Sequence, residues 1–233
     1  MKRIWCVCLL VLMLMLFSAC SNTEQTGITN PSNSDTVSEQ ENQASENNNS
    51  EPVEHGKILI AYFSWAENAV QDNIDAMTSP SVSAPGNVAQ LASWISGETG
   101  GDLFSIQVTN PYPAGWDGCL NRANKEKADG THPALSKKLD NIQEYDTVFL
   151  GYPNWWYSCP MAIYSFLDEH DLSGKQVYLF CSHGTGGLAS SVKDITAALP
   201  KGTTVSDNVF HVNQDDTPSA QNDVLDWLKE LGY

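Results

Sequence analysis

The feature that most constrains the fold is an alternation, from Lys57 onward, of short apolar runs with stretches of helical spacing. The first run, 57–63, is almost continuously apolar, which is typical of a strand covered on both faces. Further strands are predicted over 102–108, 146–151, 176–181 and around 205–212. Helices are predicted over 87–98, 116–128, 161–170, 188–199 and 219–231. This alternation predicts a doubly wound, three-layer α/β domain with a five-stranded parallel sheet over residues 57–233.

The charge balance and the cysteines exclude several functions. The chain has 12 Lys and Arg against 28 Asp and Glu, a formal net charge of −16, and no basic cluster interrupts this acidity. We therefore expect no nucleic-acid binding and no electrostatic docking on anionic lipid. Beyond residue 20, only Cys119, Cys159 and Cys181 remain, too few and too far apart for a zinc cluster. They are either buried apolar residues, which is the commoner case, or include a redox disulfide.

The first 20 residues have the pattern of a secretion signal. Lys2 and Arg3 precede an apolar run over 4–17, which is short for a membrane-spanning helix, and small residues lead into Cys20. This ending resembles the lipobox of bacterial lipoproteins, although Phe17 stands where Leu is usual. The resemblance implies a signal peptide over 1–19 and a lipidated Cys20, which would anchor the chain at the extracytoplasmic face of the bacterial cell membrane. The alternative is an ordinary secretory signal with a cysteine nearby by chance.

Residues 20–56 are predicted to form a disordered acidic tether behind the lipidated cysteine. The stretch is almost entirely polar, contains seven acidic residues and has no Lys or Arg. It cannot bury enough apolar surface to offset its ordering entropy, and its like charges repel one another. The predicted function therefore takes place close to a membrane but not inside it.

Two loops contain residue types that bind ligands. In doubly wound sheets, ligands bind beyond the carboxyl ends of the strands, where the strand order reverses. The loop after the third predicted strand contains Trp155, Trp156 and Tyr157 in succession, which either stack on a planar ligand or form a protein interface. The loop after the fourth, 182–187, is glycine-rich and precedes a helix, so its backbone amides can approach a ligand. Within it, His183 is either bonded to the backbone or a proton donor.

Three motifs in this order resemble the flavodoxin-like family, in particular its extended lipoprotein branch. They are Ala-Tyr-Phe-Ser at 61–64, Gly-Tyr-Pro-x-Trp-Trp at 151–156 and Cys-Ser-His-Gly-x-Gly at 181–186. The resemblance implies strand order 2-1-3-4-5 and FMN as cofactor, with the phosphate in the first loop and the ring between the second and third. The residues that it implies for FMN binding are Ser64, Asn68, Gly86, Asn87, Val88, Pro153, Asn154, Trp155, Trp156, Tyr157, Ser182, His183, Gly184 and Gly187.

The first loop departs from the family's phosphate motif. That motif is Ser or Thr followed by x-Thr-Gly-x-Thr, whereas here Ser64 is followed by Trp-Ala-Glu-Asn-Ala. We favour the interpretation that an insertion over 67–84 splits the motif, so that Ser64 and the amides of 86–88 bind the phosphate at a helix N-terminus. The alternative is a cradle formed by 64–68, with Glu67 turned towards solvent.

The predicted function is electron transfer or flavin-dependent reduction, of the quinone or flavin reductase type. The expected partners are a redox protein or a quinone-like small molecule, together with the membrane through the lipid anchor and a second copy of the chain in a homodimer. No separate Gly-x-Gly-x-x-Gly dinucleotide fingerprint is present, and no Gly-x-Ser-x-Gly elbow indicates a hydrolase. The alternative is a binding or sensory module with weakened or lost FMN binding, which the degenerate phosphate loop favours.

Overall fold

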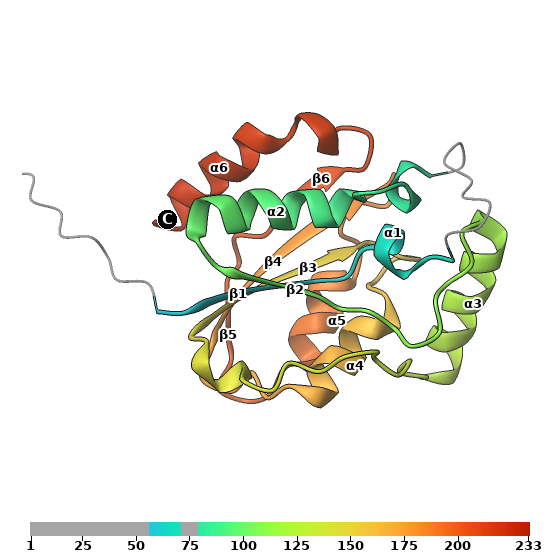
Figure 1. Cartoon of the computed structure of the whole chain (residues 1–233), viewed down its shortest axis with the longest axis horizontal. Coiled ribbons are helices and arrows are strands. Elements are labelled where there is room, and N and C mark those ends of the chain that lie inside the picture. Colours follow the sequence, from blue (N-terminus) through green and yellow to red (C-terminus); the bar gives the residue numbers. More distant parts are fainter. Residues whose placement is uncertain (1–55, 71–78) are drawn as a thin grey trace, which may run out of the picture. The chain divides into compact units, whose positions relative to one another are not determined.

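The computed structural model describes residues 56–70 and 79–233 (Figure 1). The expectations for the signal peptide and for Cys20 concern residues outside this part of the chain, as do all but the last residue of the predicted tether and the middle of the expected insertion. Of the helices in the described part, none is long and apolar enough to cross a membrane.

A parallel sheet forms the centre of the domain. Its strands are β1 (Ile58–Tyr62), β2 (Asp102–Ser105), β3 (Thr147–Pro153), β4 (Gln176–His183), β5 (Thr204–Val205) and β6 (Phe210–Asn213). They run in the order β2-β1-β3-β4-β5, with β6 also paired to β4, and every pairing is parallel. The predicted order 2-1-3-4-5 is therefore confirmed.

The described part has six helices, of which four cover the two faces of the sheet. The six are α1 (Trp65–Asn68), α2 (Asn87–Thr99), α3 (Trp116–Asp129), α4 (Met161–Glu169), α5 (Ser191–Ala198) and α6 (Gln221–Glu230), with short 3₁₀ turns at Pro80–Val82, Ile142–Glu144 and Thr217–Ser219. Helices α2 and α6 lie side by side on one face, and α4 and α5 lie on the other (Figure 1). This confirms the predicted three-layer arrangement.

Alternation along the strands divides the core into two halves. Leu59 and Ala61 of β1 belong to one buried cluster, whereas Ile58 and Ile60 belong to the other, because successive side chains of a strand point to opposite faces. The central strands pack closely: a Cβ at Gly151 of β3 would collide with the ring of Phe180 on β4. Both faces of β1 and β3 are therefore buried, which explains their nearly continuous apolar sequence.

Several boundaries differ from the sequence prediction, and three of the differences have a local cause. The second strand stops short of 108: the amide of Ile106 still bonds to the carbonyl oxygen of Tyr62 on β1, but that of Val108 bonds to the Asn68 side chain. The fifth strand is in two pieces, β5 and β6, since the amide of Asn208 bonds to the Ser206 hydroxyl in a local turn. Helix α5 begins at Ser191 and not at 188, because 185–190 form turns.

Candidate functional site

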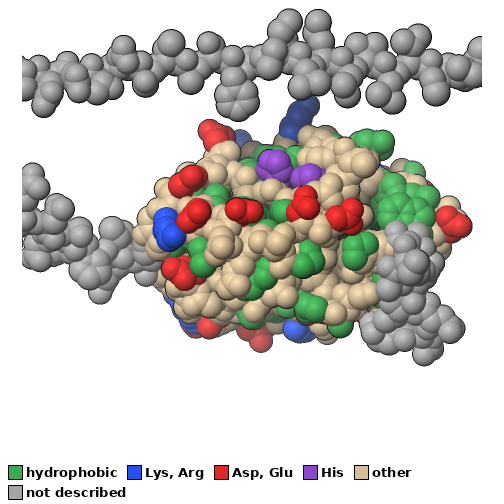
Figure 2. Space-filling view, turned by 90° about the horizontal axis from the view of Figure 1, so that it is seen from above, with side chains coloured by type: hydrophobic (Ala, Val, Ile, Leu, Met, Phe, Trp, Pro, Cys, Tyr) green, Lys and Arg blue, Asp and Glu red, His purple; other side chains and the backbone are tan. Residues whose placement is uncertain are grey.

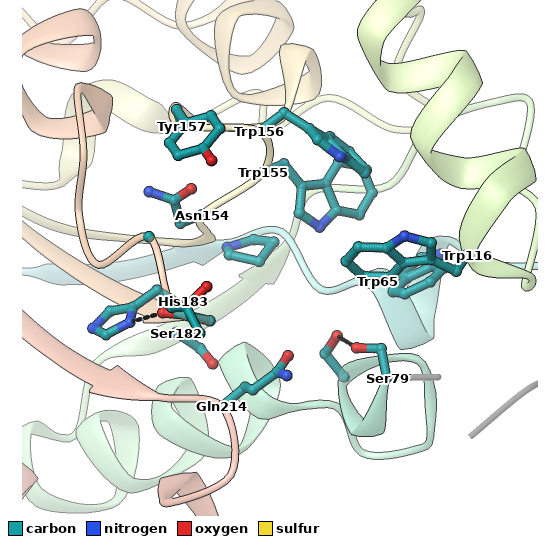
Figure 3. Close-up of a pocket in the computed structure, with 15 residues that line it drawn as sticks. Trp65, Ser79, Trp116, Asn154, Trp155, Trp156, Tyr157, Ser182, His183 and Gln214 are labelled. Carbon is teal, nitrogen blue, oxygen red and sulfur yellow. Dashed lines mark hydrogen bonds between the residues drawn. The ribbon is translucent and has the colours of Figure 1, made fainter. Parts of the chain in front are cut away.

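A pocket of about 320 Å³ lies at the carboxyl ends of β3 and β4 (Figure 3). Among the described residues, those that line it are Trp65, Ser79, Ser81, Trp116, Pro153, Asn154, Trp155, Trp156, Tyr157, Ser182, His183, Gly184, Thr185, Gly186 and Gln214. None of these is Lys, Arg, Asp or Glu, so the lining is aromatic and polar but without fixed charge. The structure thus brings together the two loops that the sequence analysis selected.

The three aromatic residues after β3 have different environments. Trp155 is buried, and its ring meets the rings of Phe63 and Tyr112 edge-on at centroid distances of 5.2 and 5.1 Å. Trp156 is half-buried, while Tyr157 is 71% exposed. Trp155 therefore forms a wall of the pocket that is continuous with the core, and the other two side chains are the ones available at its mouth.

Trp156 and Tyr157 occupy a tight turn with unfavourable backbone angles. Trp155 and Ser158 exchange two backbone hydrogen bonds of 3.1 Å, and the two residues between them have φ of 48° and 67°. Positive φ at both central positions defines a type I′ turn, which normally contains Gly, Asn or Asp. The left-handed conformation costs about 1–2 kcal/mol per non-glycine residue, so the surrounding structure must stabilise this turn.

Side chains of α3 and the start of α5 hold the turn in place. Lys127 of α3 donates to the carbonyl oxygen of Trp156 at 3.1 Å. The amide of Ser190, the N-cap of α5, donates to the carbonyl oxygen of Tyr157 at 3.1 Å. The hydroxyls of Ser158 and Ser190 each donate to Asp194 at 2.6 Å, and these bonds lower the pKa of the Asp194 carboxyl. Two helices thus fix the orientation of the aromatic side chains.

The loop after β4 forms a second wall. Asn154 donates to the carbonyl oxygen of Gly187 at 2.8 Å and so connects the two loops. Nδ1 of His183 lies 2.8 Å from the carbonyl oxygen of Gly184, and Nε2 lies 3.1 Å from Nδ1 of His211. Burial and the neighbouring His183 lower the pKa of His211. Both nitrogens of His183 have partners, which agrees with the backbone-bonded interpretation of this residue.

Beside the pocket, the structure places Ser64 next to Gly86. The Ser64 hydroxyl is buried and has no hydrogen-bond partner among the described residues. Gly86 is the N-cap of α2 and has φ of 81°, and a Cβ there would collide with the Ser64 oxygen. The first amides of α2 have no partners within the helix, so they are available to an anion. The interpretation of a split motif requires this juxtaposition.

The structure does not support a ligand role for the Asn68 side chain. Asn68 donates to the carbonyl oxygens of Ser64 and Ile106 and accepts from Val108, so its side chain is fully used within the fold. Glu67 is exposed, as the cradle alternative expects, but it accepts hydrogen bonds from Tyr62 and Ser105. A phosphate cradle over 64–68 that used the Asn68 side chain would therefore have to break hydrogen bonds that the fold already makes.

Several other predicted residues lie outside the lining of the pocket. Val88 is buried in the core next to α6, so only its backbone amide could meet a ligand. Asn87 donates to the Ser182 hydroxyl and to the carbonyl oxygen of Gln214, which joins α2 to the far wall. Gly187 does not line the pocket but accepts the bond from Asn154.

Seven residues that line the pocket are not among the predicted FMN-binding residues. Thr185 and Gly186 belong to the selected 182–187 loop, and Trp116 could be either a pocket or a core residue from the sequence. The other four, Trp65, Ser79, Ser81 and Gln214, were missed. The hydroxyls of Ser79 and Ser81 lie 2.7 Å apart within the expected insertion. Three serines alternate with Pro and Val over 79–83, and this run was the available signal, because closely spaced hydroxyls ahead of a glycine and a helix can bind an anion.

The fold and the pocket define an open, doubly wound α/β protein with a ligand pocket at the carboxyl ends of its central strands. Residues 76–231, well over half of the chain, match the profile of the flavodoxin family. The chain therefore belongs to the flavodoxin family. Among the curated proteins, none matches the sequence significantly.

The chain also resembles solved structures of the same fold, and each match covers nearly the whole length of the solved chain. A protein assigned as a flavoprotein from Bacteroides uniformis is 26% identical, with a TM-score of 0.56 over 75% of this chain and 99% of that one. A similar one from Bacteroides eggerthii is 27% identical, with a TM-score of 0.51 over 73% and 99%. A flavoprotein from Lactobacillus acidophilus, solved in complex with FMN, is 19% identical, with a TM-score of 0.51 over 72% and 99%, and shows the fold alone.

Proposed function

We propose that this chain binds FMN in the pocket and transfers electrons between a donor and an acceptor at the outer face of a membrane. The observation that carries the proposal is the buried, unpartnered Ser64 hydroxyl beside Gly86 at the N-terminus of α2. Membership of the flavodoxin family and the related fold crystallised with FMN support the choice of cofactor.

The residues at the α2 end fit a phosphate group. A buried hydroxyl without a partner costs about 1–3 kcal/mol, which a ligand can recover by bonding to it. Helix α2 has 13 residues, and the positive end of its dipole favours an anion near Gly86. Ser79 and Ser81 line the adjoining pocket, and the backbone of Ser81 lies next to Gly86. Phosphate would thus be held by hydroxyls and amides, without a basic side chain among the lining residues.

The other end of the pocket fits a flat ring. Trp156 and Tyr157 can pack against such a ring, and the backbone of 182–186 can bond to its polar edge. The buried Trp155 excludes water from behind. When bound, FMN supplies one-electron and two-electron transfer chemistry, while the protein determines its orientation, access and potential.

The proposed place of action is the membrane surface. Lipidation of Cys20 and an acidic tether would keep the domain near the membrane surface, where redox proteins and quinone-like molecules are available. The alternative, a binding or sensory module, is favoured by the missing glycine and threonines after Ser64. The two proposals differ in whether FMN stays bound and is reduced and reoxidised.

Flavin retention after desalting tests the proposal. The full chain, purified in detergent and mixed with FMN, is expected to keep the visible flavin bands. Gly86→Ala should lose them, since the new Cβ fills the space beside Ser64 and the φ of Gly86 disfavours alanine. Gly97→Ala on the same helix is the matched control, because nothing lies near that position. A wild-type chain that stays colourless would refute the proposal and favour the alternative, a binding module that has lost FMN.

A further inference from the structure

Exposed aromatic side chains are concentrated at the mouth of the pocket. Among the described residues, the exposed large hydrophobic side chains are Val70, Leu103, Trp116 and Tyr157. Two of these four, Trp116 and Tyr157, line the pocket. Figure 3 shows them on opposite sides of it, with Trp155 and Trp156 between them. Exposed apolar side chains that gather at a concave site are typical of ligand binding.

Trp116 is held in position although 41% of it is exposed. It is the first residue of α3, in the long connection between β2 and β3. Its ring lies 6.4 Å from the ring of Trp65 and 6.2 Å from the ring of Trp156. The bond from Lys127 to the Trp156 carbonyl ties the same helix to the aromatic turn a second time. The indole is therefore a positioned surface and not a loosely attached side chain.

The aromatic end of the pocket, around Trp116, offers a ligand no charged partner in its described lining. No lining residue that the structure describes carries a fixed charge, and His183 already has partners at both ring nitrogens. A diphosphate or carboxylate placed here would lose its hydration without gaining a cationic partner. Acidic side chains are spread over the face of the molecule that Figure 2 shows, and their charge disfavours the approach of an anion from that side. An uncharged ring loses little hydration and gains contact with Trp116.

We propose that Trp116 is the binding platform for a second ligand: a flat, uncharged, conjugated ring of the quinone class. The platform lies across the pocket from the 182–186 loop, at the mouth. This inference rests on the proposed function, because it identifies the small-molecule partner of the flavin pocket. The expected second ligand is therefore a small uncharged molecule, and neither a protein nor a nicotinamide dinucleotide.

Equilibrium dialysis of the full chain with duroquinone tests the platform. We expect wild-type protein, saturated with FMN, to bind duroquinone, and Trp116→Ala to bind it about tenfold more weakly, which corresponds to about 1.4 kcal/mol, within the range of an aromatic contact. Trp116→Phe should recover most of the affinity, since it keeps an aromatic face. Trp94→Ala is the matched control, because Trp94 packs against the opposite face of the sheet. Retained FMN is measured in the same samples.

A charged probe and the flavin readout separate the outcomes. Anthraquinone-2-sulfonate has the larger ring system but should bind more weakly than duroquinone because of its charge. Equal duroquinone affinity in Trp116→Ala and Trp94→Ala overturns the proposal, as does a wild type that binds no duroquinone, the result expected for a protein partner. Loss of FMN from Trp116→Ala would assign this residue to the flavin and also overturn it. Should wild type hold no FMN, the proposed function fails, while the same titration without FMN still tests Trp116.

Discussion

Replacing Ser64 by alanine should change stability and ligand affinity in opposite directions. Ser64 is 1% exposed, and its buried hydroxyl has no hydrogen-bond partner among the described residues. Burial of an unsatisfied hydroxyl costs about 1–3 kcal/mol, and Ser64→Ala removes that group while leaving the Cβ in place. We therefore expect the FMN-free variant to be about 1 kcal/mol more stable than wild type in urea unfolding, whereas most substitutions in a buried position destabilise.

The same variant should bind FMN more weakly. A hydrogen bond to a charged group contributes about 1.5–3 kcal/mol, so its loss should raise the dissociation constant roughly 10- to 150-fold. Titration followed by flavin fluorescence measures this change. The two effects have one cause, because the hydroxyl lacks a partner only until phosphate bonds to it.

Ser165→Ala is the matched control for the Ser64 variant. Ser165 is also buried, but its hydroxyl donates to the carbonyl oxygen of Pro133 at 2.7 Å. Its replacement should destabilise the protein by about 1 kcal/mol and leave FMN affinity unchanged. If Ser64→Ala destabilised the protein as Ser165→Ala does, the Ser64 hydroxyl would be satisfied without ligand. If it bound FMN as tightly as wild type, the phosphate would lie elsewhere. Either result refutes the reasoning.

Three further predictions concern the aromatic turn and the buried thiols. Tyr157→Asn should stabilise the FMN-free protein by about 1 kcal/mol in urea unfolding, because Asn tolerates positive φ and the tyrosine is largely exposed. The same variant should bind FMN more weakly. A less stable variant would contradict the assigned backbone strain. The hydrogen bonds from Ser158 and Ser190 lower the pKa of Asp194 below the ordinary 3.8. Wild type should therefore be more stable than Asp194→Asn at neutral pH, and this difference should disappear as the pH falls through the lowered pKa. A difference in stability that stays constant in acid unfolding would refute this. Burial raises the pKa of Cys119 and Cys159 to about 12 and also raises that of Cys181, so iodoacetamide should label the three only after unfolding; unfolded protein that requires a reductant first would show a disulfide.

Features set by neighbouring residues could be predicted from the sequence. The strands β1, β3 and β4 and the helix α2 follow from apolar runs and spacing, and Gly100 ends α2 in the left-handed conformation that glycine allows. The aromatic loop and the glycine-rich loop could be selected because strand ends of a parallel sheet meet at one edge. The break in the fifth strand could not, since it depends on a local turn at Ser206 that competes with pairing.

Contacts between distant segments limited the prediction of the site. Asn68 has the residue type of a phosphate ligand, but the fold uses its side chain to fix the chain after β2. Trp65 and Trp116 begin two separate helices, α1 and α3, and only the packing of α3 brings their rings to a centroid distance of 6.4 Å. A single sequence carries no signal for such pairs, because they depend on how the long connections cross the edge of the sheet.

Features that folding alone would not favour occur together at this edge of the molecule. Ser64 is buried without a partner, Trp156 and Tyr157 hold a turn suited to Gly or Asn, and Trp116 leaves 41% of its surface exposed. The unpartnered hydroxyl and each of the two strained residues cost about 1–3 kcal/mol, against a total stability of about 5–15 kcal/mol for a domain. Residues and backbone conformations that reduce stability are expected at functional sites, where a ligand supplies the missing contacts. Because the unpartnered hydroxyl and the strained turn lie beside and within one pocket, a ligand with a phosphate at the α2 end and a flat ring at the aromatic end accounts for both with a single binding event, and the exposed face of Trp116 is left for the second ligand.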